Sequence, residues 1–182
     1  VDHGAPYRFH HWMSGRRFET IMSGLTFTSR EPPAYKDKFW EVRQMLDVWN
    51  TYMHDNFRPS WVSCLDESMS IWFNRWSFPG WIFCPRKPHP FGNEYHTIGC
   101  GDSTIMFNVL LMEGKDRPKE LPAEQGTKSL LLKMCKVLFG TGKIVVLDSG
   151  FCVLAALVAL RNFGVFAAAV IKKRRYWPRY IA

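Results

Sequence analysis

The sequence lacks a long uninterrupted apolar run. Its most hydrophobic stretch, Ile144–Ile171, contains Asp148 and Arg161, and the apolar run Phe151–Leu160 inside it is short. A helix that crosses a bilayer needs about 20 consecutive apolar residues. We therefore expect no membrane among the partners of this protein.

Closely spaced cysteines are also missing. The five cysteines are scattered, none belongs to a Cys-x-x-Cys pair, and their number is odd. This pattern argues against the disulfide framework of a secreted domain, and favours small core residues in a reducing compartment, the cytosol or the nucleus. His10 and His11 are adjacent but have no third ligand nearby in the sequence, so we expect no zinc site there.

Acidic residues are fewer than basic residues. The 182 residues include 24 Lys and Arg against 16 Asp and Glu, which gives a formal charge of +8. A positive excess favours a polyanionic partner, of which nucleic acid is the commonest; the alternative is that these residues only keep the protein soluble. With 47% hydrophobic residues, the chain can bury a core, and its length predicts one domain with or without a helical appendage.

Residues 1–59 are predicted to form a helical segment. Apolar side chains recur at three- and four-residue spacing over Phe39–Phe57, as in an amphipathic helix. A shorter helix is predicted over His11–Ser23, with Gly24 as its stop. The link between the two helices contains Pro32 and Pro33, which interrupt regular structure.

From residue 60 onward the pattern predicts short strands and helices. Alternation over Trp61–Trp72 predicts a strand with one face formed by Val62, Cys64, Asp66, Ser68 and Ser70. After a loop at Phe78–Gly92, the expected elements are strands Tyr95–Cys100 and Thr104–Met112, helix Thr127–Phe139, strand Lys143–Leu147, helix Phe151–Asn162 and strand Val165–Ile171. The continuous apolar runs predict that the last two strands are buried, Lys143–Leu147 on both faces.

This order, βββαβαβ, is that of an α/β fold with an RNase H-like mixed sheet. The first strand then lies beside the fourth and parallel to it, and right-handed crossovers place the helices on the faces of the sheet. We therefore predict two parts: a helical segment at 1–59, and at 60–182 an RNase H-like domain that is incomplete at its C-terminus.

Two aspartates occupy special places in that order. Asp66 lies within the first strand, and Asp148 directly follows the fourth, at the end of a strand where such sheets bind ligands. On neighbouring strands their carboxylates would lie about 5 Å apart. Because two such charges repel each other unless a cation lies between them, hard oxygen ligands here predict Mg²⁺, or Mn²⁺ in its place.

Each aspartate also has an ordinary interpretation. Asp66 alone is compatible with a solvated strand residue or with an ion pair to Arg75 or Arg86, and Asp148 alone with a helix N-cap. Glu67 ranks below Asp66 because neighbouring residues of a strand point to opposite faces.

Two basic clusters are candidate DNA contacts. Arg86 and Lys87 lie in the loop that contains Trp81 and Phe83, a mixture that can grip a phosphate backbone and stack on bases. The second cluster is Lys172, Lys173, Arg174 and Arg175, whose functional interpretations are phosphate contact and nuclear import. Solvated surface is the alternative for both clusters.

Short motifs along most of the chain resemble those of piggyBac-type transposases and their domesticated relatives. They are Arg17-Phe18 with Ile21 and Leu25-Thr26-Phe27, Lys36-Asp37-Lys38 with Val42-Arg43, Leu65-Asp66-Glu67-Ser68-Met69, and Pro85-Arg86-Lys87-Pro88 with Phe91-Gly92. The last two, at this separation, are the specific ones. The string after Asp148 departs from the family's Asp-Asn-Trp-Phe-Thr-Ser and keeps only the Asp and the Phe.

The resemblance implies a DDE transposase that cleaves DNA strands and transfers them by a metal-dependent, cut-and-paste reaction. Asp66 and Asp148 would be two of three catalytic carboxylates, with the third expected beyond Ala182, so we expect this fragment alone to be inactive. The implied partners are double-stranded transposon ends, target DNA and a second copy of the chain, through a dimerisation or DNA-binding role of 1–59. The implied location is the nucleus.

Two other functions remain open from the sequence. A domesticated protein could keep the fold for DNA binding or protein interaction after losing the chemistry, and the departures after Asp148 favour this alternative. Another RNase H-like nuclease would cleave DNA without strand transfer, but it would leave the Lys-Pro motif unexplained.

Overall fold

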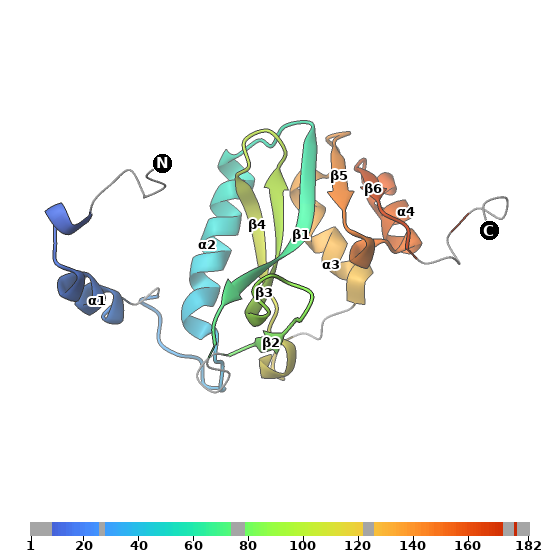
Figure 1. The fold of residues 1–182 in the computed structure, drawn as a ribbon. Coiled ribbons are helices and arrows are strands. Elements are labelled where there is room, and N and C mark those ends of the chain that lie inside the picture. The colour runs from blue at the N-terminus through green and yellow to red at the C-terminus, as the bar shows by residue number, and fades with distance from the viewer. Residues whose placement is uncertain (1–8, 26–27, 74–78, 122–125, 173–176, 178–182) are drawn as a thin grey trace.

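One mixed sheet organises the molecule (Figure 1). The computed structural model describes residues 9–25, 28–73, 79–121, 126–172 and 177. The strands are β1 (Val62–Ile71), β2 (Trp81–Phe83), β3 (Phe91–Cys100), β4 (Met106–Leu111), β5 (Ile144–Leu147) and β6 (Phe166–Ala169). Their order is β2-β3-β1-β5-β6, and β4 also pairs with β3. The strand β1 runs antiparallel to β3 and parallel to β5, as predicted for the RNase H-like order.

The helices differ in how closely they pack on the sheet. They are η1 (Phe9–His11), α1 (Gly15–Ser23), α2 (Trp40–Asn56), η2 (Gly114–Asp116), α3 (Gly126–Cys135), η3 (Lys136–Leu138), η4 (Ser149–Phe151) and α4 (Leu154–Asn162). α2 runs along β4, α3 packs against β3, β4 and α4, and α4 also packs on β6. Figure 1 shows α1 apart from the sheet, beyond α2, and none of its residues is buried.

A side chain of α2 closes the edge of β4. Asn50 donates from Nδ2 to the carbonyl of Val109 at 2.9 Å and accepts at Oδ1 from the Val109 amide at 2.9 Å. Both backbone groups of Val109 are thereby satisfied on the side of the strand that has no strand partner. This is the arrangement that backbone groups at a covered sheet edge require.

An ion-pair network fixes the start of α2. The Arg43 guanidinium donates to both oxygens of Glu113 at 2.7 Å each and to the carboxylate of Asp37. Asp37 also accepts from the amide of Phe39 at 2.9 Å. Burial by itself raises the pKa of Asp37, but the hydrogen bonds from Arg43 and Phe39 outweigh it, and the pKa is lowered. The network joins the N-terminal end of α2 to the residues that follow β4.

The core lies between the sheet and the helices α3 and α4. Side chains that face it from the central strands are fully buried, among them Leu65, Ile98, Val145 and Leu147, and α3 contributes Leu131 and Met134. Alternate residues on β1 and β5 are exposed: Val62 is 37% and Val146 40% exposed. One face of these strands is therefore covered by helices, and the described residues leave the other face open.

Several boundaries differ from the predictions. The predicted loop Phe78–Gly92 contains β2, and β3 begins at Phe91, four residues earlier than expected. The strands β5 and β6 are not buried as predicted: besides Val146, Phe166 is 52% exposed, because no described helix covers that face. The predicted helix Phe151–Asn162 begins at Leu154, after the short turn η4, and α1 begins at Gly15 rather than at His11. Among the described residues, no helix is long and apolar enough to cross a membrane.

Candidate metal and DNA site

The register of β1 and β5 brings the two aspartates together. Cys64 pairs with Val146 and Leu65 with Leu147 in this parallel ladder, so the next positions along both strands are Asp66 and Asp148. Both aspartates are exposed. They fall on the same open face as Cys64 and Val146, because side chains two apart share a face.

Asp66 is held by short polar contacts on β1 and β3. One carboxylate oxygen accepts from the amide of Glu67 at 2.7 Å. Next to it, the hydroxyls of Ser68 and Thr97 lie 3.1 Å apart. Burial and then the negative charge of Asp66 raise the pKa of the Cys64 thiol, which places the carboxylate and the thiol near each other. No described lysine or arginine forms an ion pair with Asp66; Arg75, one predicted partner, lies outside the described residues.

Asp148 lies at the beginning of η4 in extended conformation, with φ −68° and ψ 164°. It occupies the N-cap position that was the alternative interpretation, but its side chain forms no capping hydrogen bond. Its pKa is lowered, first through the backbone amide of Ser149 and then through the positive charge of Lys172. Asp148 is therefore an exposed carboxylate that favours its ionised form, as a ligand of a cation requires.

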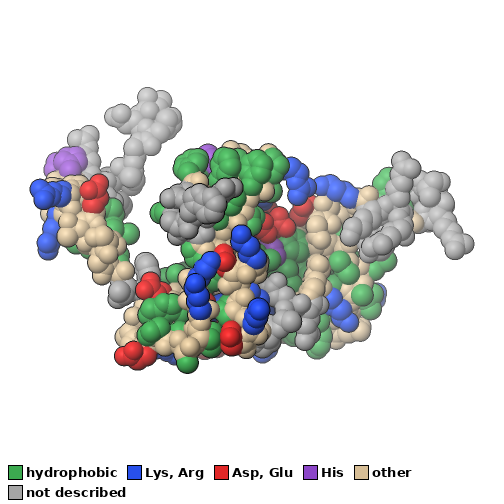
Figure 2. Space-filling view, turned by 90° about the horizontal axis from the view of Figure 1, so that it is seen from below, with side chains coloured by type: hydrophobic (Ala, Val, Ile, Leu, Met, Phe, Trp, Pro, Cys, Tyr) green, Lys and Arg blue, Asp and Glu red, His purple; other side chains and the backbone are tan. Residues whose placement is uncertain are grey.

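Basic residues lie beside both aspartates. Lys87 donates from Nζ to the backbone carbonyl of Glu67 at 2.8 Å, next to Asp66. Arg86 is exposed, and Lys172 is exposed close to Asp148. Lys173, Arg174 and Arg175 lie outside the described residues. In the view of Figure 2, basic side chains flank a recess that contains acidic side chains.

The two most specific motifs of the sequence meet in space. Lys87 contacts the Asp-Glu motif through the carbonyl of Glu67. Gly92 of the Lys-Pro motif has φ +150°, and a Cβ there would lie 1.8 Å from the carbonyl oxygen of Ser70. Only glycine lets β3 approach β1 this closely, since other residues would clash and rarely adopt this φ. The Asp-Glu motif and the Lys-Pro motif therefore belong to one structural unit, the pair of strands β1 and β3, and this pairing accounts for their separation in the sequence.

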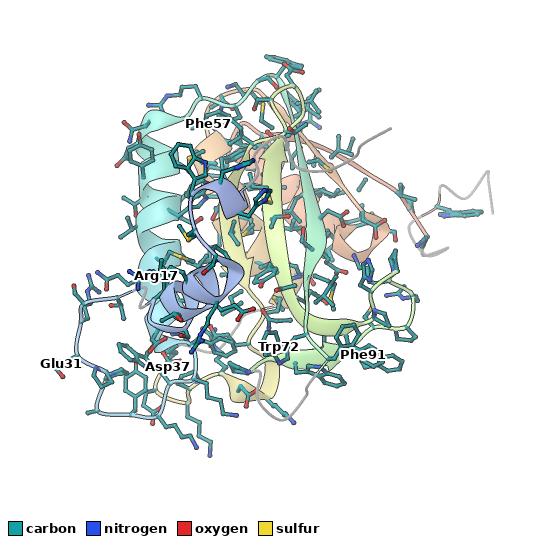
Figure 3. All side chains as sticks on the ribbon, turned by 60° about the vertical axis from the view of Figure 1, so that its left-hand side comes forward. Arg17, Glu31, Asp37, Phe57, Trp72 and Phe91 are labelled. Atoms are coloured by element: carbon teal, nitrogen blue, oxygen red, sulfur yellow. The ribbon has the colours of Figure 1, made fainter. Side chains whose placement is uncertain are left out.

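Aromatic rings gather where β1, β2 and β3 meet. Phe91 stacks on Trp81 and Phe83, with centroids 5.9 and 5.1 Å apart, and contacts Phe73 at 6.2 Å. Figure 3 shows Phe91 and the nearby Trp72 at this end of the sheet. The indole of Trp81 donates to the carbonyl of Trp72 at 2.9 Å. Phe83 is 55% exposed, so the cluster presents a ring surface beside Arg86 and Lys87.

The donor set of the two aspartates fits a hard divalent cation. Both are exposed carboxylates on one face, and oxygen ligands with retained water are what Mg²⁺ and Mn²⁺ bind. Sequence reasoning did not single out Glu94 and His96, two alternate residues of β3 whose side chains lie near Glu67 on the opposite face of the sheet. Their two-residue spacing on one strand is a weak signal that only the pairing with β1 makes visible.

Comparisons with known proteins agree with this fold. The family model described as Transposase IS4, of the DDE type, matches residues 3–182. A cryo-EM structure of piggyBac transposase in a synaptic complex with hairpin DNA is similar, with a TM-score of 0.76 and 17% identity over 93% of this chain. The chain covers 36% of that transposase chain, about a third of its length. No curated protein matches it. At this identity the structural likeness shows the fold, and it confirms the RNase H-like sheet predicted from the element order.

Proposed function

This chain belongs to the IS4-type DDE transposase family, and on that premise we propose that it carries two catalytic, metal-binding carboxylates of a DNA transposase, Asp66 and Asp148. The observation that supports this most strongly is the parallel register of β1 with β5, which ends at Leu65 and Leu147, one residue before each aspartate. A chance pair of surface aspartates would not be expected at the strand positions where the family has its carboxylates.

The proposed roles follow from the surroundings of each residue. Asp66 offers the carboxylate oxygen that the Glu67 amide does not occupy, and Asp148 stays ionised because the Ser149 amide and Lys172 lower its pKa. A bound pair of Mg²⁺ ions would supply electrostatic stabilisation of the attacking and leaving oxygens in an in-line phosphoryl displacement. No general base is required from this part of the chain.

Positive charge next to the carboxylates would position DNA. Arg86 and Lys172 are exposed, and each can neutralise a phosphate near the site, whereas Lys87 also holds the backbone of β1. The exposed ring of Phe83 can stack on an unpaired base. We extend the same role to Lys173, Arg174 and Arg175, which follow Lys172 in the sequence.

The parent reaction would be cut-and-paste transposition with strand cleavage and strand transfer. It needs the third carboxylate that the family resemblance implies, and Asp66 and Asp148 would supply the other two. The solved piggyBac transposase is described in complex with hairpin DNA, and double-stranded DNA is the partner we propose here. A homodimer through residues 1–59 and a nuclear location also belong to this proposal.

A non-catalytic, domesticated DNA-binding protein is the second candidate. It is favoured by Ser149 and Gly150, which replace larger residues of the family motif directly after Asp148 and form the short turn η4. A domesticated protein of this kind could keep DNA binding while losing tight metal binding. Metal binding therefore separates the two candidates.

The deciding experiment is Mn²⁺ binding followed by electron paramagnetic resonance. We expect tight binding to the wild-type chain, and a loss of affinity of at least about tenfold for Asp66→Asn and for Asp148→Asn, since each removes a charged ligand. Asp102→Asn is the matched control, because Asp102 is an exposed aspartate in the turn after β3. Unchanged binding in both site variants would refute the shared site, and weak binding in the wild type would favour the domesticated protein.

DNA contact has its own test. The affinity for a double-stranded oligonucleotide is measured by fluorescence anisotropy at several salt concentrations. Arg86→Ala or Lys172→Ala should each weaken binding and lower the slope of log affinity against log salt by about 1, as expected for one lost phosphate contact. Lys38→Ala is the control, since Lys38 is already paired with Asp116 at 2.6 Å. Slopes that match the wild type for both variants would exclude these residues from the interface.

A further inference from the structure

A second group of metal-ligating side chains lies on the helix-covered side of the sheet, behind Asp66. One ligand atom each of Glu67, Glu94 and His96 lies within 4.8 Å of the others. Glu67 on β1 is the direct antiparallel partner of His96 on β3, and Glu94 is two residues from His96 on the same face. This group shares no residue with the pair Asp66 and Asp148, and it projects from the other face of β1.

The group is enclosed. The side chain of His96 is 5% exposed and that of Glu94 17% exposed, and Glu67 is half-buried. The turn η4 lies beside it: the ring of Phe151 meets the His96 ring edge-on at 5.2 Å, and a Cβ on Gly150 would lie 3.9 Å from a carboxylate oxygen of Glu67. Water therefore has limited access to compensate the charges.

The buried imidazole has spare binding capacity. Its Nε2 lies 3.3 Å from a carboxylate oxygen of Glu94, while its Nδ1 is buried and has no hydrogen-bond partner among the described residues. Since one ring nitrogen can hold the proton, the other can give its lone pair to an ion. Since buried polar atoms are as a rule hydrogen-bonded, this nitrogen is free to accept a ligand.

The charges of the group also favour a cation. Two carboxylates this close repel each other in a place of low dielectric. Lys87 donates to the backbone carbonyl of Glu67, and no ion pair joins a described lysine or arginine to the carboxylate of Glu67 or Glu94. A divalent ion between the two carboxylates would balance both negative charges.

We propose that Glu67, Glu94 and His96 form a binding site for a divalent transition-metal ion, with Zn²⁺ as the best-suited probe. One imidazole nitrogen and two carboxylates are a donor set that suits Zn²⁺, and three protein ligands leave one position of a tetrahedron for water. The nitrogen donor distinguishes this site from the all-oxygen pair on the opposite face, which suits Mg²⁺. The ion would cross-link β1 and β3 directly behind Asp66, and next to the turn that begins at Asp148.

The role of the bound ion is structural, in positioning the two aspartates. Glu67 immediately follows Asp66, and its amide is the hydrogen-bond donor to Asp66. Fixing the Glu67 side chain therefore restrains the backbone that orients Asp66. Packing of Phe151 on His96 carries the same restraint to the turn after Asp148.

Zn²⁺ binding is measured by isothermal titration calorimetry on the Asp66→Asn/Asp148→Asn double variant, which removes the proposed Mg²⁺ ligands. We expect one Zn²⁺ ion per chain in this background, and a loss of affinity of at least about tenfold when Glu94→Gln or His96→Gln is added. His54→Gln is the matched control, since the His54 side chain is 55% exposed. Co²⁺ in place of Zn²⁺ should give visible absorption bands that disappear with His96→Gln.

Each outcome decides the proposal. Zn²⁺ binding that is absent from the double variant, or equal with and without Glu94→Gln, overturns it. If the changes on β3 prevent folding, as judged by circular dichroism, Glu67→Gln replaces them because the Glu67 side chain is only half-buried; unchanged Zn²⁺ affinity there also overturns the site. The double variant keeps this test independent of the proposed catalytic carboxylates.

Discussion

Replacing Arg43 with methionine should destabilise the protein strongly, because Arg43 is the counter-charge of two buried carboxylates. The side chains of Asp37 and Glu113 are 1% and 4% exposed, and Arg43 donates to both. Methionine keeps much of the aliphatic packing and removes only the charge and the donors. Asp37 would then keep the Phe39 amide but lose its counter-charge, and Glu113 would keep Arg117 at 3.2 Å but lose both shorter bonds.

The expected loss of unfolding free energy follows from the burial of these ion pairs. Removing one partner of a buried ion pair costs about 3–5 kcal/mol. Because the Arg43 side chain is itself 26% exposed, we expect the lower end, about 3 kcal/mol. For a protein of this length about 1 kcal/mol corresponds to a shift in Tm of roughly 2–4 °C, so the expected fall in Tm is about 6–12 °C. The measurement is urea unfolding followed by circular dichroism, together with a thermal scan.

Two variants serve as controls. Arg43→Lys keeps the charge but loses the planar donor geometry that contacts both carboxylates, so its loss should be intermediate. Lys38→Ala breaks the ion pair with Asp116, in which Lys38 is 46% exposed, and exposed pairs contribute below about 1 kcal/mol. Equal losses for Arg43→Met and Lys38→Ala would refute the assignment of the Arg43 network as the buried anchor of α2.

The pH dependence of the unfolding free energy tests the same explanation. In the wild type the pKa of Asp37 is lowered, so its pairing stabilises the folded state above the ordinary value of about 3.9 and is lost as the pH falls through the lowered value. Without Arg43, burial raises the pKa of Asp37, and protonation relieves the penalty at higher pH. The stability difference between wild type and Arg43→Met should therefore narrow as the pH is lowered from 7 to about 4; a constant difference would contradict this explanation.

Three further predictions concern the sheet and the site. Gly92→Ala should cost at least about 2 kcal/mol of unfolding free energy in urea, because its Cβ would meet the Ser70 carbonyl at 1.8 Å with φ at +150°; a neutral effect would contradict the close approach of β1 and β3. Asn50→Ala should cost about 1–3 kcal/mol in the same assay, since both backbone groups of Val109 lose their partner. Asn56→Ala is the milder control, because the Asn56 amide donates to the carbonyl of Tyr52 within α2. Mn²⁺ at about 100 times its Kd should raise the unfolding free energy of the wild type by about 2.7 kcal/mol, and that of Asp148→Asn far less. Equal Mn²⁺-induced shifts in Tm for the two proteins would argue against Asp148 as a ligand.

The strand β1 shows how much of the site could be predicted. Its alternation of Val62, Cys64 and Asp66 with buried residues indicated a strand, its two faces and the face that bears Asp66, and the structure confirms all three. The prediction that β1 runs parallel to β5 came from the order of elements alone and is also confirmed. That Asp66 and Asp148 bind a metal stays a prediction, as does the division of the chain at residue 59.

Other features depended on partners that lie far away in the sequence. The three residues of β2 form a strand only because β3 offers them an edge, and so short a segment carries no periodicity of its own. The apolar runs in β5 and β6 were expected to be buried, but burial depends on which helices cover a face, and the described helices cover only one.

The sequence by itself determined the order of helices and strands, the faces of β1, and the positions of the two aspartates at strand sites, because hydrophobic periodicity is a local property of the chain. Only the tertiary structure decided that Lys87 and Gly92 lie against β1, and that Glu67, Glu94 and His96 converge behind Asp66. These contacts join residues about 20 to 30 positions apart, and the register of strand pairing that creates them is set by the packing of the whole sheet.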